Sequence, residues 1–257
     1  MQVNLCMTSW EGRINNIEKV IESLLNQTYG DFVLWLTLSS DEFPDRQLPE
    51  FFQKLNDERI HVFWVKENTK TMKKVFPILK YLSTDDDVII TVDDDVIYDS
   101  HFVENRLSDF KKWNGEYPIT SNRFSYQYSI KSFFSSCGSV FSKRMLEGYE
   151  TFVNRSIVET NDDDWAYTFI ILLNGFRFKP CSNYELQEFQ FVNQENASSK
   201  TIDTNQMVYK LQKRIMDFVG KENFQNTIRQ IRLNSFKADW ENFKKTDANP
   251  SYVFKKF

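Results

Sequence analysis

The feature of this sequence that most restricts its fold is an alternation between short apolar segments and longer amphipathic ones. Segments rich in β-branched and aromatic residues recur at intervals near thirty residues, at 3–7, 32–38, 60–65 and 88–92. Between them, Ile and Leu recur at helical spacing, as at 14–25 and 75–82. Strands alternating with helices form right-handed βαβ units, and near-continuous apolar strands suit burial on both faces. We therefore predict an open, mainly parallel α/β sheet flanked by helices.

The second half of the sequence is less regular. We expect a helix over 100–113, a mixed region over 119–141, and a second helix from about Asp162 that ends at Gly175, a residue type common after a helix C-terminus. A short strand over 176–178 should follow. From 203 to about 245 the spacing of apolar residues again predicts helix.

Size and composition fit one large domain with a tail. A chain of 257 residues with 41% hydrophobic residues, including 24 Phe, can bury a sizeable core, which excludes disorder. The sequence has no apolar run long enough to cross a bilayer and no N-terminal leader pattern, so we expect a cytoplasmic protein. Cys6, Cys137 and Cys181 are an odd number at spacings that match no zinc motif, which predicts buried free thiols.

Charge is distributed unevenly along the chain. The net charge is −4, yet residues 206–257 carry eleven Lys or Arg against five Asp or Glu. We therefore predict a basic helical extension over 203–257 on an acidic body over 1–202. This extension is either an ordinary solvated helical surface or a contact for anionic lipid or a partner protein.

The strongest chemical signal is the run Asp93, Asp94 and Asp95, which we call the acidic run. It directly follows the apolar strand at 88–92, so it should emerge at the carboxyl edge of the sheet, where open α/β sheets bind ligands. Adjacent carboxylates repel one another unless a cation neutralises them, and oxygen ligands suit Mg²⁺ or Mn²⁺. The alternative is a solvated acidic loop. The acids at 85–87 precede the strand instead, and we interpret them as a solvated turn.

A second acidic cluster comprises Asp162, Asp163 and Asp164, followed by Trp165, at the expected start of a helix. Carboxylates at a helix N-terminus cap backbone N–H groups, so this cluster can be purely structural. The functional interpretation is that one carboxylate takes a proton from an acceptor hydroxyl as a general base. Trp165 would then offer a flat face to a sugar ring, or lie in the core.

Several short motifs together resemble a known family. They are Thr8 and Ser9 with "RIN" at 13–15, "SLLNQTY" at 23–29, "KKVFPIL" at 73–79, "IITVDDDVIY" at 89–98, and "DDDW" followed by "LLNG" at 172–175. In this order the chain resembles bacterial glycosyltransferases of the GT-A superfamily related to family 2, of the kind found with capsule and lipopolysaccharide genes. The resemblance covers about residues 3–180. It implies a GT-A fold with a nucleotide-sugar binding half at 1–98 and an acceptor half at 99–202.

The resemblance also implies roles for residues on the donor side. Thr8, Ser9 and Arg13 would lie beside the base and ribose of a nucleotide-sugar donor, with Ser39 nearby. Lys73 and Lys74 would pair with its phosphates, although a solvated helix face is an alternative for one of them. Asp93 and Asp95 match a DxD pattern in which the last carboxylate reaches Mn²⁺ or Mg²⁺, while Asp94 faces the donor.

On the acceptor side, the resemblance aligns Asp162 and Asp163 with an acidic pair, and Asp163 is the preferred base. Asp164 replaces an apolar position of the pattern, so three carboxylates remain candidates, and Asp164 and Trp165 are placed with the acceptor. Only one Gly is retained at 135–139, where the pattern is Gly-rich. The implied activity is inverting, metal-dependent transfer from a nucleotide sugar, with a UDP-sugar favoured, to a glycan or lipid-linked acceptor in surface polysaccharide synthesis.

Other functions fit the sequence less well. A sugar nucleotidyltransferase would favour a Gly-rich, basic loop after the first strand, but 8–13 holds one Gly and one Arg. A noncatalytic module of a polysaccharide assembly complex needs neither acidic cluster. His61 and His101 form no hydrolase arrangement, and we expect His61 to be a strand residue. No P-loop and no GxGxxG motif occurs, and we expect no nucleic-acid partner.

Overall fold

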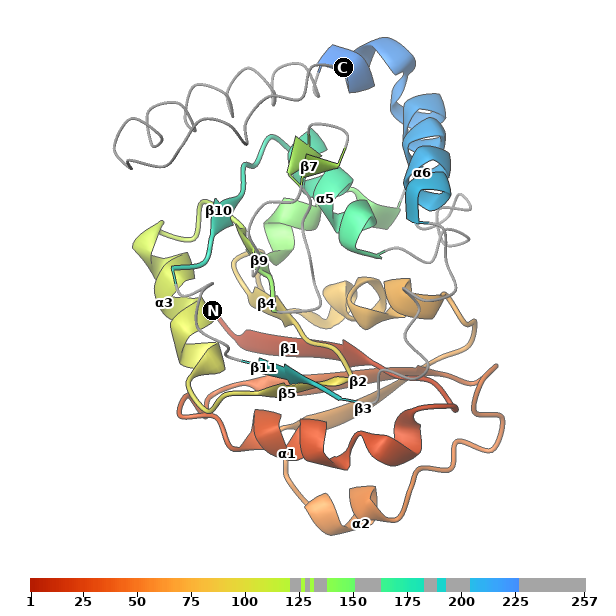
Figure 1. Cartoon of the computed structure of the whole chain (residues 1–257), viewed down its shortest axis with the longest axis vertical. Helices are drawn as coiled ribbons and strands as arrows, with labels where there is room; N and C mark the ends of the chain where they lie inside the picture. Colours follow the sequence, from red (N-terminus) through yellow and green to blue (C-terminus); the bar gives the residue numbers. More distant parts are fainter. Residues whose placement is uncertain are drawn as a thin grey trace.

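The computed structural model describes residues 1–120, 126–127, 130–131, 138–150, 163–182, 189–192 and 204–226. Its centre is a seven-stranded sheet with the order β10-β6-β9-β4-β1-β2-β3 (Figure 1). The four strands predicted from the apolar segments form one side of it, namely β1 (Val3–Thr8), β2 (Val33–Ser39), β3 (Ile60–Val65) and β4 (Val88–Thr91). The observed bounds lie within one residue of those predicted. β1 pairs in parallel with both β2 and β4, and β2 with β3, so the predicted βαβ arrangement is confirmed.

The sheet becomes mixed beyond β4. The short strand β9 (Val140–Ser142) lies antiparallel between β4 and β6 (Ile119–Thr120), and β10 (Lys179–Pro180) adds to β6 in parallel. Two small sheets stand apart from it. One pairs β5 (Val96–Tyr98) with β11 (Phe189–Phe191), and the other pairs β7 (Tyr126–Gln127) with β8 (Ile130–Lys131).

Helices cover both faces of the sheet. Figure 1 shows α1 (Glu18–Leu25) and α2 (Phe51–Leu55) on one side, with α5 (Asp163–Leu173) on the other. The buried positions Val20, Ile21 and Leu24 follow the helical spacing and place the apolar side of α1 in the core. The helix predicted over 100–113 forms α3 (Phe102–Lys112). The expected end of α5 is also confirmed, because Gly175 follows it with φ of +89°, a conformation that favours Gly.

Two expected elements differ in form. The segment predicted as a helix at 75–82 forms the 3₁₀-helix η3 (Phe76–Tyr81), which a second 3₁₀-helix, η2 (Lys70–Lys74), precedes. Pro77 lacks a backbone N–H and its ring disfavours an α-helical residue before it, which accounts for the break. Short 3₁₀-helices η1 (Ile14–Asn16) and η4 (Lys143–Leu146) occur elsewhere. The prediction of a strand over 176–178 is wrong in position, because the strand that pairs with β6 begins only at Lys179.

The turn before β4 also differs from the expectation. Asp85 and Asp86 are exposed, as predicted, but Asp87 is buried, so the prediction of a fully solvated turn is wrong for this residue. Its carboxylate accepts hydrogen bonds from the backbone N–H groups of Gln2, Ser83 and Thr84. Asp87 therefore ties the start of β4 to the start of β1.

The extension begins as predicted with a helix, α6 (Thr204–Val219). Ile215 on α6 is fully buried, and Phe224 packs against Phe169 of α5 with ring centroids 5.6 Å apart. The first part of the extension is therefore joined to the helix that carries Asp163. Residues 227–257 lie outside the described part, and no helix within the described part is long and apolar enough to cross a membrane.

Cysteine and histidine behave as expected where the structure describes them. Cys6 and Cys181 are buried free thiols, and burial raises the pKa of Cys6 well above its usual value, with Lys74 opposing in part. Cys137 lies outside the described residues. His61 is a residue of β3 and contacts the ring of Trp35 edge-on, which confirms its structural assignment.

Candidate functional site

The acidic run occupies the turn between β4 and β5, at the carboxyl edge of the central strands. Its backbone is fixed from both sides, because Asp93 N–H donates to the Tyr98 hydroxyl (2.8 Å) and the Asp95 carbonyl accepts from Val192 N–H (2.7 Å). The side chains of Asp93, Asp94 and Asp95 are only 20%, 8% and 13% exposed. These values exclude the alternative of a solvated acidic loop.

Asp94 is held by two residues of the segment that follows β1. The Ser9 hydroxyl donates to one carboxylate oxygen at 2.6 Å, and Arg13 Nη1 donates to the other at 2.5 Å. The same Nη1 lies 3.2 Å from Asp95 Oδ2, so one guanidinium joins two members of the acidic run. Burial raises the pKa of Asp94, and the opposing effects of Arg13 and Ser9 offset this only in part. The structure thus brings together the predicted residues Ser9 and Arg13 with the acidic run.

Lys74 connects the acidic run to the second acidic cluster. Its ammonium lies 2.5 Å from Asp93 Oδ1 and 3.2 Å from Asp163 Oδ2, and its side chain is 5% exposed. Burial acts to lower the pKa of Lys74, but Asp163, Asp93 and Asp164 outweigh it and raise the pKa above its usual value. Lys74 is therefore a buried cation between carboxylates about seventy residues apart in the chain.

Asp163 is the first residue of α5 and is buried, while Asp164 is partly exposed. The helix N-terminus favours a carboxylate at this position. One turn later, Tyr167 is fully buried, and burial followed by the charge of Asp163 raises its pKa well above 10. Asp162 and the side chain of Trp165 lie outside the described residues. Of the three candidate bases, the structure therefore shows Asp163 next to the acidic run.

Lys73 does not lie on a solvated helix face, and neither does Lys74, so that alternative is wrong for both. Lys73 Nζ contacts Glu42 Oε2 at 2.8 Å and Asn68 Oδ1 at 3.0 Å. The Ser39 hydroxyl bonds the same Glu42 oxygen at 3.0 Å. These four residues form a polar cluster at the carboxyl ends of β2 and β3, separate from the pair that Lys74 makes.

Two further residues lie near the end of β1. Thr8 uses its hydroxyl to bond the carbonyl of Thr37 on β2 at 2.7 Å, which stabilises the strand pair. Trp10, which the sequence argument missed, is 38% exposed on the same segment as Ser9 and Arg13. Its ring lies over Gly12, where a Cβ atom would come within 2.3 Å of the ring. A large aromatic residue two positions before a Gly, directly after a buried strand, was the available signal.

The charges of this network bear on whether a divalent cation fits. Four carboxylates, those of the acidic run and Asp163, are paired with two cations, Arg13 and Lys74. Carboxylate oxygens are the ligands that Mg²⁺ and Mn²⁺ prefer. The described residues contain no ready-made group of three acidic, Cys or His ligands. Mg²⁺ is usually held by one or two carboxylates together with waters and substrate phosphates, so Asp93 and Asp95 suit such an ion once a phosphate is present.

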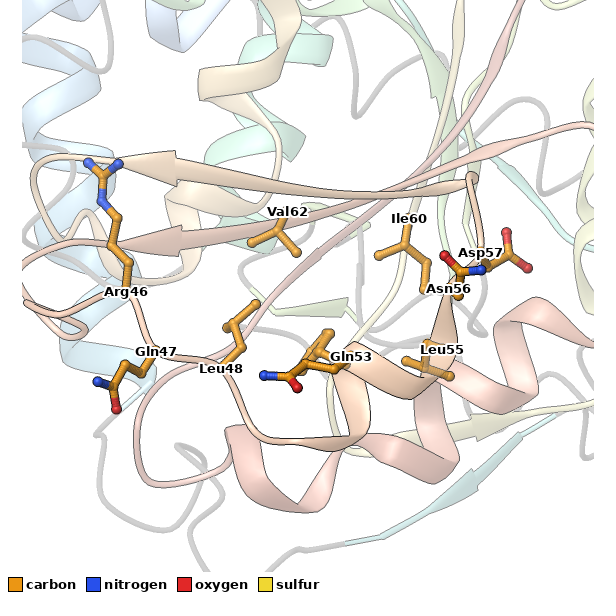
Figure 2. A pocket seen from close by; sticks show the side chains of 10 residues that line it. Arg46, Gln47, Leu48, Gln53, Leu55, Asn56, Asp57, Ile60 and Val62 are labelled. Carbon is orange, nitrogen blue, oxygen red and sulfur yellow. The ribbon is translucent and has the colours of Figure 1, made fainter.

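A surface cavity lies away from this network. It has a volume of about 620 Å³ and runs between α2 and β3, lined among others by Leu48, Phe52, Ile60 and Val62 (Figure 2). None of its lining residues belongs to the acidic run or its cation partners. We therefore do not assign it to the candidate functional site.

The fold and the site define a class of protein. The mainly parallel sheet, with an acidic run at the carboxyl edge of β4 and a second acidic residue on α5, is the GT-A fold. The family model "Glycosyl transferase family 2" matches residues 7–125, which include β1 to β4 and the acidic run. The chain therefore has the GT-A fold.

Solved structures similar to this chain include several of S. aureus TarS. The fragment 1–349 in complex with UDP-GlcNAc superposes with a TM-score of 0.59 at 11% identity, and covers 90% of this chain and 71% of the fragment. The same fragment in complex with UDP superposes with a TM-score of 0.55 at 10% identity, and the match covers 97% of this chain and 76% of the fragment. A longer TarS chain superposes with a TM-score of 0.56 at 13% identity. The match covers 91% of this chain but 43% of that TarS chain. No curated protein matches significantly.

Proposed function

We propose that this protein is a glycosyltransferase that moves a sugar from a UDP-sugar donor, with inversion, to a glycan or lipid-linked acceptor in surface polysaccharide synthesis. The observation that carries the proposal is the junction at Lys74, which brings the acidic run within one ion-pair network of Asp163. A donor site and a base are the two parts that glycosyl transfer needs in one place. The likeness to a structure with bound UDP-GlcNAc supports the choice of donor class.

Asp163 acts in this proposal as the general base. Its carboxylate takes the proton of the acceptor hydroxyl while that oxygen attacks the anomeric carbon, and the bond from this carbon to the diphosphate oxygen breaks on the opposite face. Displacement from the opposite face inverts the configuration. Lys74 holds Asp163 in place, since the ammonium lies 3.2 Å from it. Asp164 and Trp165 follow on the same helix and are proposed to contact the acceptor.

The donor is proposed to lie against the segment after β1. Ser9 and Arg13 orient Asp94, which then faces the ribose or donor sugar. Trp10 offers an exposed aromatic face on which a uracil ring can stack. The polar cluster of Ser39 and Lys73 lies at the next two strand ends, and we assign it to the nucleotide as well.

Mn²⁺ or Mg²⁺ is the proposed cofactor, held by Asp95 and Asp93. When bound, such an ion supplies charge neutralisation for the departing diphosphate. The support from this chain is the gathering of three carboxylates, each no more than 20% exposed, at the carboxyl edge of β4.

A donor screen tests the proposal. The protein is incubated with UDP-, GDP- and CMP-sugars and Mn²⁺, with oligosaccharide and lipid-linked acceptors, and nucleotide release is followed. We expect release of UDP from one UDP-sugar, and loss of release in Asp163→Asn but not in Asp217→Asn, an exposed acid on α6. Failure to turn over any donor would favour a noncatalytic assembly module, and release of pyrophosphate from UTP with a sugar phosphate would indicate a nucleotidyltransferase.

A further inference from the structure

Lys74 has a position that phosphate binding alone does not explain. It is the last residue of η2, and its ammonium contacts a carboxylate of the acidic run and the proposed base at the same time. A lysine whose only task was to bind phosphate would not need a contact with α5. The side chain is 5% exposed, so its charge is confined among these carboxylates.

The pairing with Asp93 conflicts with the proposed cation at the same carboxylate. An ammonium 2.5 Å from Asp93 Oδ1 takes the place and the charge that a divalent ion on that oxygen would have. Two cations on one partly buried carboxylate repel each other, because the effective dielectric constant there is lower than in water. Lys74 already contacts a second carboxylate, Asp163, at the longer distance of 3.2 Å. A small movement of the ammonium toward Asp163 therefore relieves the repulsion and keeps the charge paired.

We propose that Lys74 is an internal counter-cation that competes with the divalent ion for Asp93 and, once displaced, pairs with Asp163 alone. The inference rests on the proposed metal-dependent function and deepens it. Lys74 is then a positioning residue, whose pairing with the base becomes closer once the donor side has taken up its cation. An acceptor hydroxyl would thus meet a more firmly held base in the metal-loaded site.

The test measures Mn²⁺ binding to the full chain without nucleotide, by the loss of the free-ion signal in electron paramagnetic resonance. Lys74→Met removes the competing charge at similar length, so the Kd for Mn²⁺ should fall by about tenfold or more. Lys74→Arg keeps the charge and should bind Mn²⁺ within a few-fold of wild type. Lys80→Met is the matched control, because this exposed lysine of η3 lies over the ring of Tyr81 instead, and its Kd should stay unchanged.

The outcomes separate the two proposals. Wild-type protein that binds Mn²⁺, with an unchanged or raised Kd in Lys74→Met, overturns the role of Lys74 and leaves metal dependence standing. Wild-type protein that binds no Mn²⁺, alone or with UDP, overturns both. Folding of each variant is checked by circular dichroism.

A second pair of variants serves if Lys74→Met does not fold. Asp163→Asn removes the carboxylate to which Lys74 is proposed to move, so Lys74 stays with Asp93 and Mn²⁺ binding weakens by about tenfold. Asp164→Asn removes one negative charge from the adjacent position and should weaken binding much less. Equal effects of the two variants would show a general charge effect and overturn the inference.

Discussion

At the scale of single residues, the chemistry depends most on Asp163. Asp163→Asn keeps the size of the side chain but removes the base, so we expect transfer to fall by about 10²- to 10⁴-fold while affinity for UDP at saturating Mn²⁺ stays within a few-fold. Product formation and isothermal titration measure the two quantities. Asp164→Asn is the control and should lose less activity. A larger loss in the control would move the base to Asp164.

Gly12 gives a second prediction at this scale, about the ring of Trp10. In Gly12→Ala the new Cβ would lie 2.3 Å from that ring and must displace it, so UDP should bind about tenfold more weakly if uracil stacks there. Gly30→Ala is the control, because nothing lies within 4 Å of a Cβ at that position. Equal UDP affinity in the two variants would remove Trp10 from the donor site.

The sequence predicted residues of the site unevenly. The acidic run could be located because an apolar strand leads directly into it, and Asp163 because acids precede a helix. The partners of Lys74 could not be predicted, since its contact with Asp163 joins segments that only the folded chain brings together. Trp10 was missed because one aromatic residue carries no motif of its own.

At the scale of elements, the turn before β4 gives a prediction about pH. Burial acts to raise the pKa of Asp87, but the N–H groups of Gln2, Thr84 and Ser83 and the Thr84 hydroxyl outweigh it, so its pKa lies below the ordinary 3.8. A carboxylate whose pKa is lowered by folding stabilises the folded protein at pH values above the pKa that the same group has in the unfolded chain. That stability is lost as the pH falls below about 4 and through the folded pKa.

Asp87→Asn should therefore lower the free energy of unfolding by about 2 kcal/mol at neutral pH, since it replaces a charged acceptor of several hydrogen bonds. The difference from wild type should shrink as the pH falls from about 5 to 3. Urea unfolding at several pH values measures it. Asp86→Asn, at an exposed position of the same turn, is the control, and an equal effect there would contradict the role of Asp87.

Elements were predictable where local signals decide them. β1 to β4 follow from continuous apolar segments, and α3 from its amphipathic spacing. The antiparallel insertion of β9 between β4 and β6 could not be predicted, because strands of two and three residues have no periodicity and their pairing depends on distant partners. An irregular helix near Pro77 could have been predicted, because proline disfavours a regular α-helix. The helical spacing of the apolar residues instead led to the prediction of one α-helix.

At the scale of the whole molecule, the extension divides into two parts with different expected roles. The chain ending at 203 loses α6 with Ile215, and the segment after it with Phe224, both of which are buried, so its Tm should fall by several degrees. The chain ending at 226 keeps both residues and should retain the wild-type Tm and UDP affinity. Differential scanning calorimetry compares the three chains, and equal Tm values would show that α6 adds no stability.

The remaining residues, 227–257, are the segment to test for membrane contact. Seven of them are Lys or Arg and three are Asp or Glu, which favours attraction to anionic lipid. The full chain should sediment with phosphatidylglycerol vesicles at low salt, and the chain ending at 226 should not. Equal sedimentation would leave this segment as an ordinary solvated surface.

The place of β9 between β4 and β6 has a consequence for the order in which the protein is made. A ribosome adds about 5–20 residues per second, so β1 to β4 are synthesised seconds before β9 and α5. Until then the edge of β4 that pairs with β9 has no strand beside it, and Lys74 cannot yet contact Asp163. The nucleotide-facing half can thus take shape early, whereas the base is added late, and a nascent chain that stalls before residue 163 would present a donor site that cannot react.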